Sequence, residues 1–187
     1  MNARILACAL AGALCFALPA RASTNTETLG TGVAIALPVV AGGITLWKDD
    51  FTGSAQLLTS TFLTVGTVYG LKHFVRECRP FATPCAPNSP NWNSFPSDTS
   101  ALAFAPAQFL WQRYGWQYGV PAYAAAAFVG WSRVDAKQHH WWDVATSAAI
   151  SLGYNELITT RYRPRSGFYS DLQASPDGVY ASLNYRW

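Results

Sequence analysis

Charged residues are scarce in this chain, and that scarcity narrows the kinds of partner it can have. Only 12% of the 187 residues are charged, and the formal net charge is +3. This charge is too small to indicate nucleic acid as a partner, because such an interface needs a strongly basic surface. Half of the residues are hydrophobic and 14% are aromatic. The composition suits a compact helical protein in or near a membrane, with its few cations gathered for one anionic ligand.

Histidine and cysteine are also few. Three histidines and four cysteines are present, and their spacing does not match a zinc site. Cys8 and Cys15 fall within a predicted export signal. The other two, Cys78 and Cys85, lie close together across a proline-rich loop. In an oxidising compartment this arrangement predicts a disulfide, with two unpaired thiols as the alternative.

The first 22 residues predict a cleaved export signal. Arg4 provides a positive charge, residues 5–19 are apolar, and small residues precede a cleavage point at Ser23. An uncleaved anchor helix is the alternative, although the apolar run is short for a full span. The mean hydropathy of +0.08 is low for a chain with several spans. We therefore expect an exported, periplasmic protein that is either associated with or embedded in the inner membrane.

Five stretches of the mature chain predict helices. Their apolar periodicity and lack of charge place these helices at residues 31–47, 53–71, 99–113, 116–131 and 139–160. The second stretch has a threonine-rich face and an apolar face, and the alanines at 124–127 allow close packing. Residues 79–97 contain five prolines and predict a loop. The pattern indicates one domain over residues 23–160, built as an antiparallel bundle of about five helices.

The tail at residues 161–187 differs from the rest. Apolar and polar residues alternate with a period of two over residues 179–187, after a turn at 175–178. Residues 168–174 would form the other arm of a β-hairpin. The predicted fold is therefore all-α, with a small C-terminal hairpin that serves as a docking ribbon rather than as part of a membrane barrel.

The candidate chemistry is concentrated in residues 132–143. Ser132 and Arg133 are followed by His139 and, four residues later, by Asp143. If a helix begins near His139, the last two side chains share one face. A carboxylate placed there holds the imidazole in one tautomer and raises its basicity. A solvated helix start with a salt bridge is the alternative.

Other groups that suit an anion lie at two more helix ends. Lys72 ends the second predicted helix and Arg79 begins the loop. Ser97 precedes a helix whose N-terminal amides form a natural anion site. Together with Arg133 these residues would hold a phosphoryl group. Each cation taken alone is more often a solvated surface residue.

The blocks at residues 72–80, 96–99 and 132–143 resemble the three-part signature of the type 2 phosphatidic acid phosphatase and vanadium haloperoxidase superfamily. The resemblance covers most of residues 48–157. It implies that His139 takes a phosphoryl group as phosphohistidine, and that Asp143 orients it and stabilises its charge. It also implies a phosphorylated substrate, most simply a lipid, and no metal or other cofactor. The phosphate oxygens would be bound by Lys72, Arg79, Ser97 and Arg133.

The second block departs from the family pattern. The family has Pro-Ser-Gly-His, whose histidine protonates the leaving group, whereas Asp98 and Thr99 follow Ser97 here. Loss of a general acid costs about a hundredfold to ten-thousandfold in rate, and a carboxylate at this place repels a phosphate dianion. We expect Asp98 to act as the acid, provided that burial keeps it protonated. His73, His140 or a good leaving group such as a diphosphate are alternatives.

Two functions therefore stay open. The first is a phosphatase that needs no metal and acts on a lipid phosphate, a lipid diphosphate or another phosphoester. The second is a non-catalytic relative that binds phosphorylated headgroups or has a structural role in the envelope. Haloperoxidase chemistry ranks third, because that branch also depends on the missing histidine.

Overall fold

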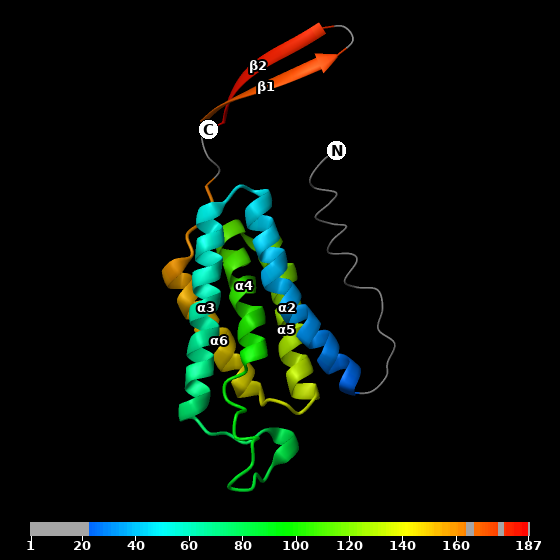
Figure 1. Cartoon of the computed structure of the whole chain (residues 1–187), viewed down its shortest axis with the longest axis vertical. Helices are drawn as coiled ribbons and strands as arrows, with labels where there is room; N and C mark the ends of the chain where they lie inside the picture. Colours follow the sequence, from blue (N-terminus) through cyan, green and yellow to red (C-terminus); the bar gives the residue numbers. More distant parts are fainter. Residues whose placement is uncertain (1–22, 164–166, 176–177, 187) are drawn as a thin grey trace.

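The computed structural model describes residues 23–163, 167–175 and 178–186, so the predicted export signal lies outside the described residues. Within them, five α-helices run side by side (Figure 1), which confirms the predicted all-α bundle. They are α2 (Ser23–Trp47), α3 (Phe51–Phe74), α4 (Asp98–Tyr114), α5 (Trp116–Asp135) and α6 (Trp141–Ile158). One turn of 3₁₀ helix, η1 (Pro80–Ala82), lies in the predicted loop between α3 and α4.

Two strands are assigned in the tail, β1 (Gly167–Ser175) and β2 (Gly178–Arg186). They pair antiparallel, with Gly167 opposite Arg186. Figure 1 shows them beyond one end of the bundle. The docking role suggested for this tail stays a prediction.

Helix α4 is the centre of the bundle and contacts each of the other four helices. Four alanines on it are fully buried: Ala101, Ala103, Ala105 and Ala107. Such small side chains let neighbouring helices approach closely, and Phe109 and Leu110 fill the space beside them. The helix ends at Gly115, whose φ of +91° is a conformation that favours glycine.

Helix α3 buries several small polar residues and exposes several large apolar ones. Ser60 and Thr64 are fully buried, and their hydroxyls donate to the carbonyls of Leu57 (3.3 Å) and Ser60 (2.7 Å). Leu58 and Phe62 are 70% and 77% exposed. The predicted faces are therefore divided: Thr64 is buried but Thr59 is exposed, and Leu57 and Val68 are buried although Leu58, Phe62 and Tyr69 point outward. This arrangement is typical of helices that contact lipid, whose interfaces with other helices are built from small residues.

Helix α2 has the strongest membrane signal among the described helices. Its segment Asn25–Trp47 alone has the length and apolar composition needed to cross a membrane, with 28% of it buried in the bundle. The helix continues through Pro38 and begins at Ser23, earlier than the predicted start at Thr31. The extra turns place Glu27 beside Arg133 in the last turn of α5.

A buried ion pair fastens the end of the bundle where α3 begins and where α4 and α6 end. Nε of Arg113 donates to Oδ2 of Asp50 at 2.7 Å, and its Nη2 lies 2.5 Å from Oδ1. Asp50 also caps α3 by accepting the backbone N–H of Gly53 at 2.9 Å. Nη1 of Arg113 donates to the carbonyl of Thr160 at 2.7 Å. One side-chain pair therefore holds three helices together.

Candidate active site

His139 and Asp143 form a buried pair where α5 ends and α6 begins. Nδ1 of His139 lies 3.3 Å from Oδ2 of Asp143, and the two side chains are 2% and 0% exposed. The same Oδ2 accepts hydrogen bonds from Oγ of Ser94 at 2.6 Å and from the backbone N–H of His140 at 2.9 Å. Because Asp143 engages Nδ1, the ring nitrogen left for chemistry is Nε2.

The route by which His139 and Asp143 meet differs from the predicted one. Helix α6 begins at Trp141 with His140 as its N-cap, whereas the sequence placed the start at His139. His139 therefore precedes the helix, and the pair does not share one helical face. Asp143 is the third residue of α6, and its carboxylate folds back over the helix start, as in a capping box. This capping geometry brings the carboxylate to the imidazole.

Burial and hydrogen bonding decide the charges of the pair. Burial lowers the pKa of His139 below its ordinary 6.5; the hydrogen bond with Asp143 opposes this, and the charges of Lys72 and Arg79 lower it further. Burial alone would raise the pKa of Asp143. Hydrogen bonds from His139, Ser94 and a backbone amide outweigh burial and lower that pKa to about 2. At neutral pH the pair is therefore a neutral imidazole held by a carboxylate, which suits a nucleophile.

The three predicted cations lie around this pair. Nζ of Lys72, near the end of α3, donates to the carbonyl of Asn93 at 2.9 Å, and Nε of Arg79 donates to Oδ1 of Asn93 at 2.8 Å. Arg133 is buried in the last turn of α5, and its carbonyl accepts the backbone N–H of His139 at 3.3 Å. Burial lowers the pKa of both Lys72 and Arg133, and the charge of Arg79 lowers both further. The charges of Asp98, beside Lys72, and of Glu27, beside Arg133, oppose these shifts. Three cations are therefore gathered here, as an anion site requires, together with carboxylates that partly balance them.

Two of these cations have carboxylate partners within the chain. Nζ of Lys72 lies 3.8 Å from Oδ1 of Asp98. Nη1 of Arg133 lies 3.5 Å from Oε1 of Glu27, and its Nη2 donates to the carbonyl of the same residue. The Asp98 side chain is 49% exposed. The burial on which the hypothesis of Asp98 as a protonated acid depended is therefore absent.

Ser97 lies at the site, but its hydroxyl serves as a helix cap. It is fully buried; its Oγ accepts the backbone N–H of Ser100 at 3.3 Å and lies 2.9 Å from Oγ of that residue. Its backbone N–H donates to the carbonyl of Asp143 at 3.3 Å, and Oγ of Ser147 donates to its carbonyl at 2.7 Å. Ser97 thus ties α4 to α6. To bind phosphate, its hydroxyl would have to release Oγ of Ser100.

The loop that carries Arg79 and Ser94 is braced. Cys78 and Cys85 form the predicted disulfide, with a Cα–Cα distance of 5.9 Å, and this prediction is confirmed. The backbone N–H of Arg79 donates to the carbonyl of Asn91 at 3.1 Å. These links restrict the loop, so Arg79 is presented to the site at little further entropic cost.

Sequence reasoning did not find Ser94 or Glu27. Ser94 stands in a loop whose prolines and asparagines predict only irregular structure, and no motif includes it. Glu27 lies 106 residues before Arg133 in the chain. The single signal available for Glu27 was its isolation, because no other acidic residue lies between Ser23 and Trp47. That isolation did not reveal its partner.

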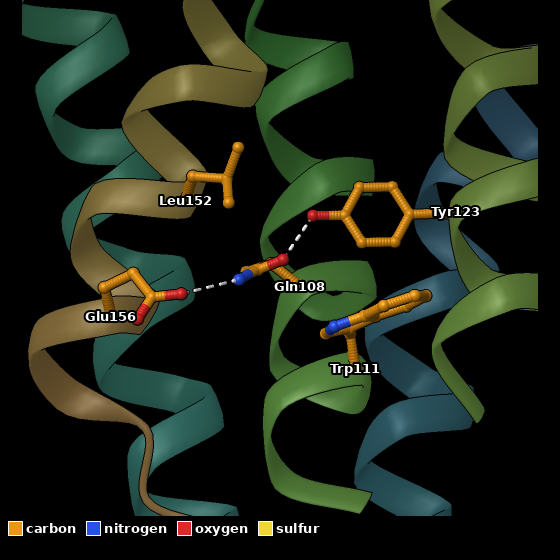
Figure 2. A pocket seen from close by; sticks show the side chains of 5 residues that line it. All are labelled: Gln108, Trp111, Tyr123, Leu152 and Glu156. Atoms are coloured by element: carbon orange, nitrogen blue, oxygen red, sulfur yellow. Dashed lines mark hydrogen bonds between the residues drawn. The ribbon is translucent and has the colours of Figure 1, made fainter. Parts of the chain in front are cut away.

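A separate hollow of about 470 Å³ lies between α4, α5 and α6. Figure 2 shows Gln108 in its middle, accepting from the hydroxyl of Tyr123 and donating through Nε2 to Oε1 of Glu156 at 3.3 Å. Trp111 and Leu152 complete the lining. None of the predicted site residues lines this hollow, and its polar groups satisfy one another.

The fold and the buried histidine–aspartate pair define a class of phosphate-handling helical protein, and the chain belongs to the PAP2 superfamily, whose model matches residues 53–165. A lipid A 4′-phosphatase of Helicobacter pylori (strain J99) is 35% identical over 162 residues, covering 81% of this chain and 80% of that protein. The crystal structure of Aquifex aeolicus LpxE matches with a TM-score of 0.51, over 76% of this chain and 95% of that one. At 22% identity it shows the shared fold alone. The resemblance seen in the three sequence blocks is confirmed.

Proposed function

We propose that the protein is a PAP2-type phosphatase that hydrolyses a phosphorylated lipid through a phosphohistidine on His139. One observation carries this proposal: a buried imidazole, 3.3 Å from a buried carboxylate, lies among cations whose charges lower its pKa. A neutral histidine beside several cations is suited to attack phosphorus, because the cations can hold the anionic group that the ring must approach.

In the proposed first step, Nε2 of His139 attacks phosphorus and the bond to the lipid oxygen breaks. Lys72, Arg79 and Arg133 hold the equatorial oxygens as they gain charge. Asp143 accepts the Nδ1–H and stabilises the positive ring that results. In the second step, water attacks phosphorus, the N–P bond breaks, and inorganic phosphate leaves.

The histidine that protonates the leaving oxygen in the family pattern is replaced by Thr99 in this chain. Asp98 is half-exposed and close to Lys72, so its proposed role becomes the relay of a proton from solvent. This arrangement favours a substrate whose leaving group needs little protonation, such as a lipid diphosphate.

We also propose that the protein is exported and works at a membrane. The outward apolar side chains of α3 and the candidate membrane span found in α2 support this location. The related protein is named for a lipid substrate, which would reach the site from the membrane.

The direct test is release of inorganic phosphate by the purified full chain from a lipid monophosphate and a lipid diphosphate. We expect faster release from the diphosphate, loss of release in His139→Ala, and an acid-labile phosphoryl adduct trapped on His139. His73→Ala tests the alternative acid: His73 is exposed and its Nδ1 bonds the carbonyl of Tyr69 at 2.9 Å, so we expect unchanged phosphate release in this variant, and a loss would assign the proton donor to His73. Folded protein that releases phosphate from neither lipid would overturn the proposal.

A second function, binding of phosphorylated headgroups without turnover, is favoured by the internal partners of two cations. Asp98 lies beside Lys72 and Glu27 beside Arg133, so substrate must compete with both carboxylates. This function predicts vanadate binding without turnover, and no recovery of activity in the Asp98→Gly, Thr99→His double variant. Recovery in that variant would favour a phosphatase ancestry with weakened chemistry.

A further inference from the structure

A groove of about 300 Å³ begins at the edge of the candidate active site, between α2, α3 and α4. Its polar members are Asp98 and Thr99, in the first turn of α4, and Thr31 on α2. Its apolar members are Ala34, Ile35, Val65 and Leu102. Leu102 lies one turn beyond Asp98 on α4, and Ala34 lies nearly one turn beyond Thr31 on α2. The groove therefore has a polar mouth and an apolar body.

The mouth of the groove is continuous with the proposed phosphate site. Asp98 lines the groove, and its carboxylate is 3.8 Å from Nζ of Lys72, one of the cations expected to hold phosphate. Thr99 occupies the position of the histidine that protonates the leaving group in the family pattern. A phosphoryl group at Lys72 would therefore place its leaving group at the mouth.

We propose that this groove holds a fatty acyl chain of the substrate, and that it selects lipid phosphates over short, soluble phosphoesters. The inference rests on the proposed function and names the part of the substrate that the chain recognises. An apolar lining gains free energy only from an apolar occupant, and an acyl chain joined to the phosphate is the occupant that both the lining and the mouth require.

The replacement of the family's histidine by Thr99 also affects the size of the groove mouth. A threonine side chain is smaller than the imidazole of the family pattern, so Thr99 widens the mouth while it removes a proton donor. Room for the lipid is thus obtained at the position where acid catalysis is weakened.

Contacts near the site hold the α2 wall of the groove in place. A Cβ on Gly30 would lie 1.9 Å from Oγ of Ser132, so glycine lets α2 pack directly on α5. One turn away, the carbonyl of Glu27 accepts from the guanidinium of Arg133. Helix α2 precedes residues 53–165, which the family model matches. The α2 wall is therefore a feature of this chain beyond that matched region.

The test uses alkyl diphosphates with a short (butyl) or a long (dodecyl) chain and the full-length protein in detergent. In the parent protein, kcat/KM should rise with chain length, by up to about fourfold for each methylene that the groove buries. Val65→Trp fills the groove; it should lower kcat/KM for the dodecyl substrate by about tenfold or more and leave the butyl substrate within about twofold. Leu58→Trp is the matched control, because Leu58 lies on the same helix and is 70% exposed.

Other outcomes separate the two proposals. If Val65→Trp lowers kcat/KM equally for both substrates, or for neither, the groove does not bind the acyl chain. The proposed phosphatase activity would be unaffected by that result. If no substrate is turned over, the proposed function fails, and the groove is tested by binding alone. A dodecyl phosphate with a photoreactive chain should then label residues of α2, α3 or α4 near Val65 in His139→Ala, and less so after Val65→Trp. Labelling elsewhere, or competition by a peptide of residues 1–22, would assign the groove to another occupant.

Discussion

The two ends of the bundle both bury charge, but they satisfy it differently. At the end held by Asp50, both carboxylate oxygens are bonded to Arg113, and Tyr114 and a backbone amide add further hydrogen bonds. At the other end, Oδ2 of Asp143 accepts three hydrogen bonds, whereas its Oδ1 has no hydrogen-bond partner within the described part of the chain. The charge cluster at Asp50 is saturated and holds helices together, whereas the carboxylate at Asp143 keeps one oxygen that can still accept a hydrogen bond.

The pKa values express the same contrast. Burial opposes charge at both Asp50 and Arg113, yet mutual contact lowers the pKa of Asp50 and raises that of Arg113. Around the candidate site, burial lowers the pKa of Lys72 and Arg133; Asp98 and Glu27 oppose this shift and Arg79 adds to it. Folding therefore stabilises the charged forms at one end and disfavours those of two cations at the other, which a bound phosphate would stabilise.

The largest expected effect comes from breaking the saturated end. Arg113→Met should lower the free energy of unfolding by about 3–5 kcal/mol, because it leaves the buried Asp50 carboxylate unpaired. Denaturant unfolding followed by circular dichroism measures this change. Lys72→Met, at the other end, should leave unfolding nearly unchanged while phosphate release falls sharply to a residual rate. Comparable losses of stability in the two variants would erase the distinction between the ends.

Ser94→Ala tests whether the site end is built for orientation as well as charge. Its hydroxyl donates to Oδ2 of Asp143 at 2.6 Å, and such a bond to a charged group stabilises by about 1.5–3 kcal/mol. We expect that loss of stability, and a fall in kcat of about tenfold with little change in KM, because His139 is less firmly oriented. Rescue of kcat by Ser94→Thr would support the positioning role. A rise in KM alone would point to substrate binding instead.

Two glycines of α3 should respond in opposite directions. A Cβ at Gly53 would lie 2.2 Å from Oδ2 of Asp50 and 2.9 Å from Nε of Arg113, whereas one at Gly66 meets nothing within 4 Å. Gly53→Ala should therefore destabilise by about 1–3 kcal/mol, and Gly66→Ala should stabilise by about 0.5–1 kcal/mol through helix propensity. Thermal unfolding of the pair provides the comparison, and a shift of the same sign in both would contradict it.

The smallest effect concerns the acid limb of activity. The nucleophile must be neutral, and the folded pKa of His139 lies below 6.5; kcat/KM should therefore hold as pH falls past that value and decline only through the lowered pKa. Lys72→Met removes a charge that lowers this pKa, so the limb should move to higher pH. Asp143→Asn removes a hydrogen bond that raises it, so the residual activity should shift to lower pH. Profiles of kcat/KM against pH for the parent and both variants, each scaled to its own maximum, show in which direction the acid limb moves.

Much of the bundle could be predicted because it depends on local pattern. Apolar periodicity located all five helices to within a few residues at most ends, and the loop prolines marked where α4 could not begin. The start of α2 was missed by eight residues, since Ser23 and Thr31 are the observed and predicted starts. Helix α6 begins at Trp141 and not at the predicted His139. The side chain of Asp143 caps the helix at His140, and such a cap, which apolar periodicity does not reveal, fixes the first helical residue.

The order of residues is enough to show that a histidine, an aspartate and three cations stand at signature spacings, and that two cysteines lie close enough along the chain to predict a disulfide. These are properties of short segments. Helix packing, by contrast, places Ser94 against Asp143, brings Glu27 to Arg133 across 106 residues, and leaves Asp98 half-exposed beside Lys72. Such partners depend on how helices pack, because a side chain's neighbours across a bundle are set by the approach of whole helices and not by the residues beside it in the chain.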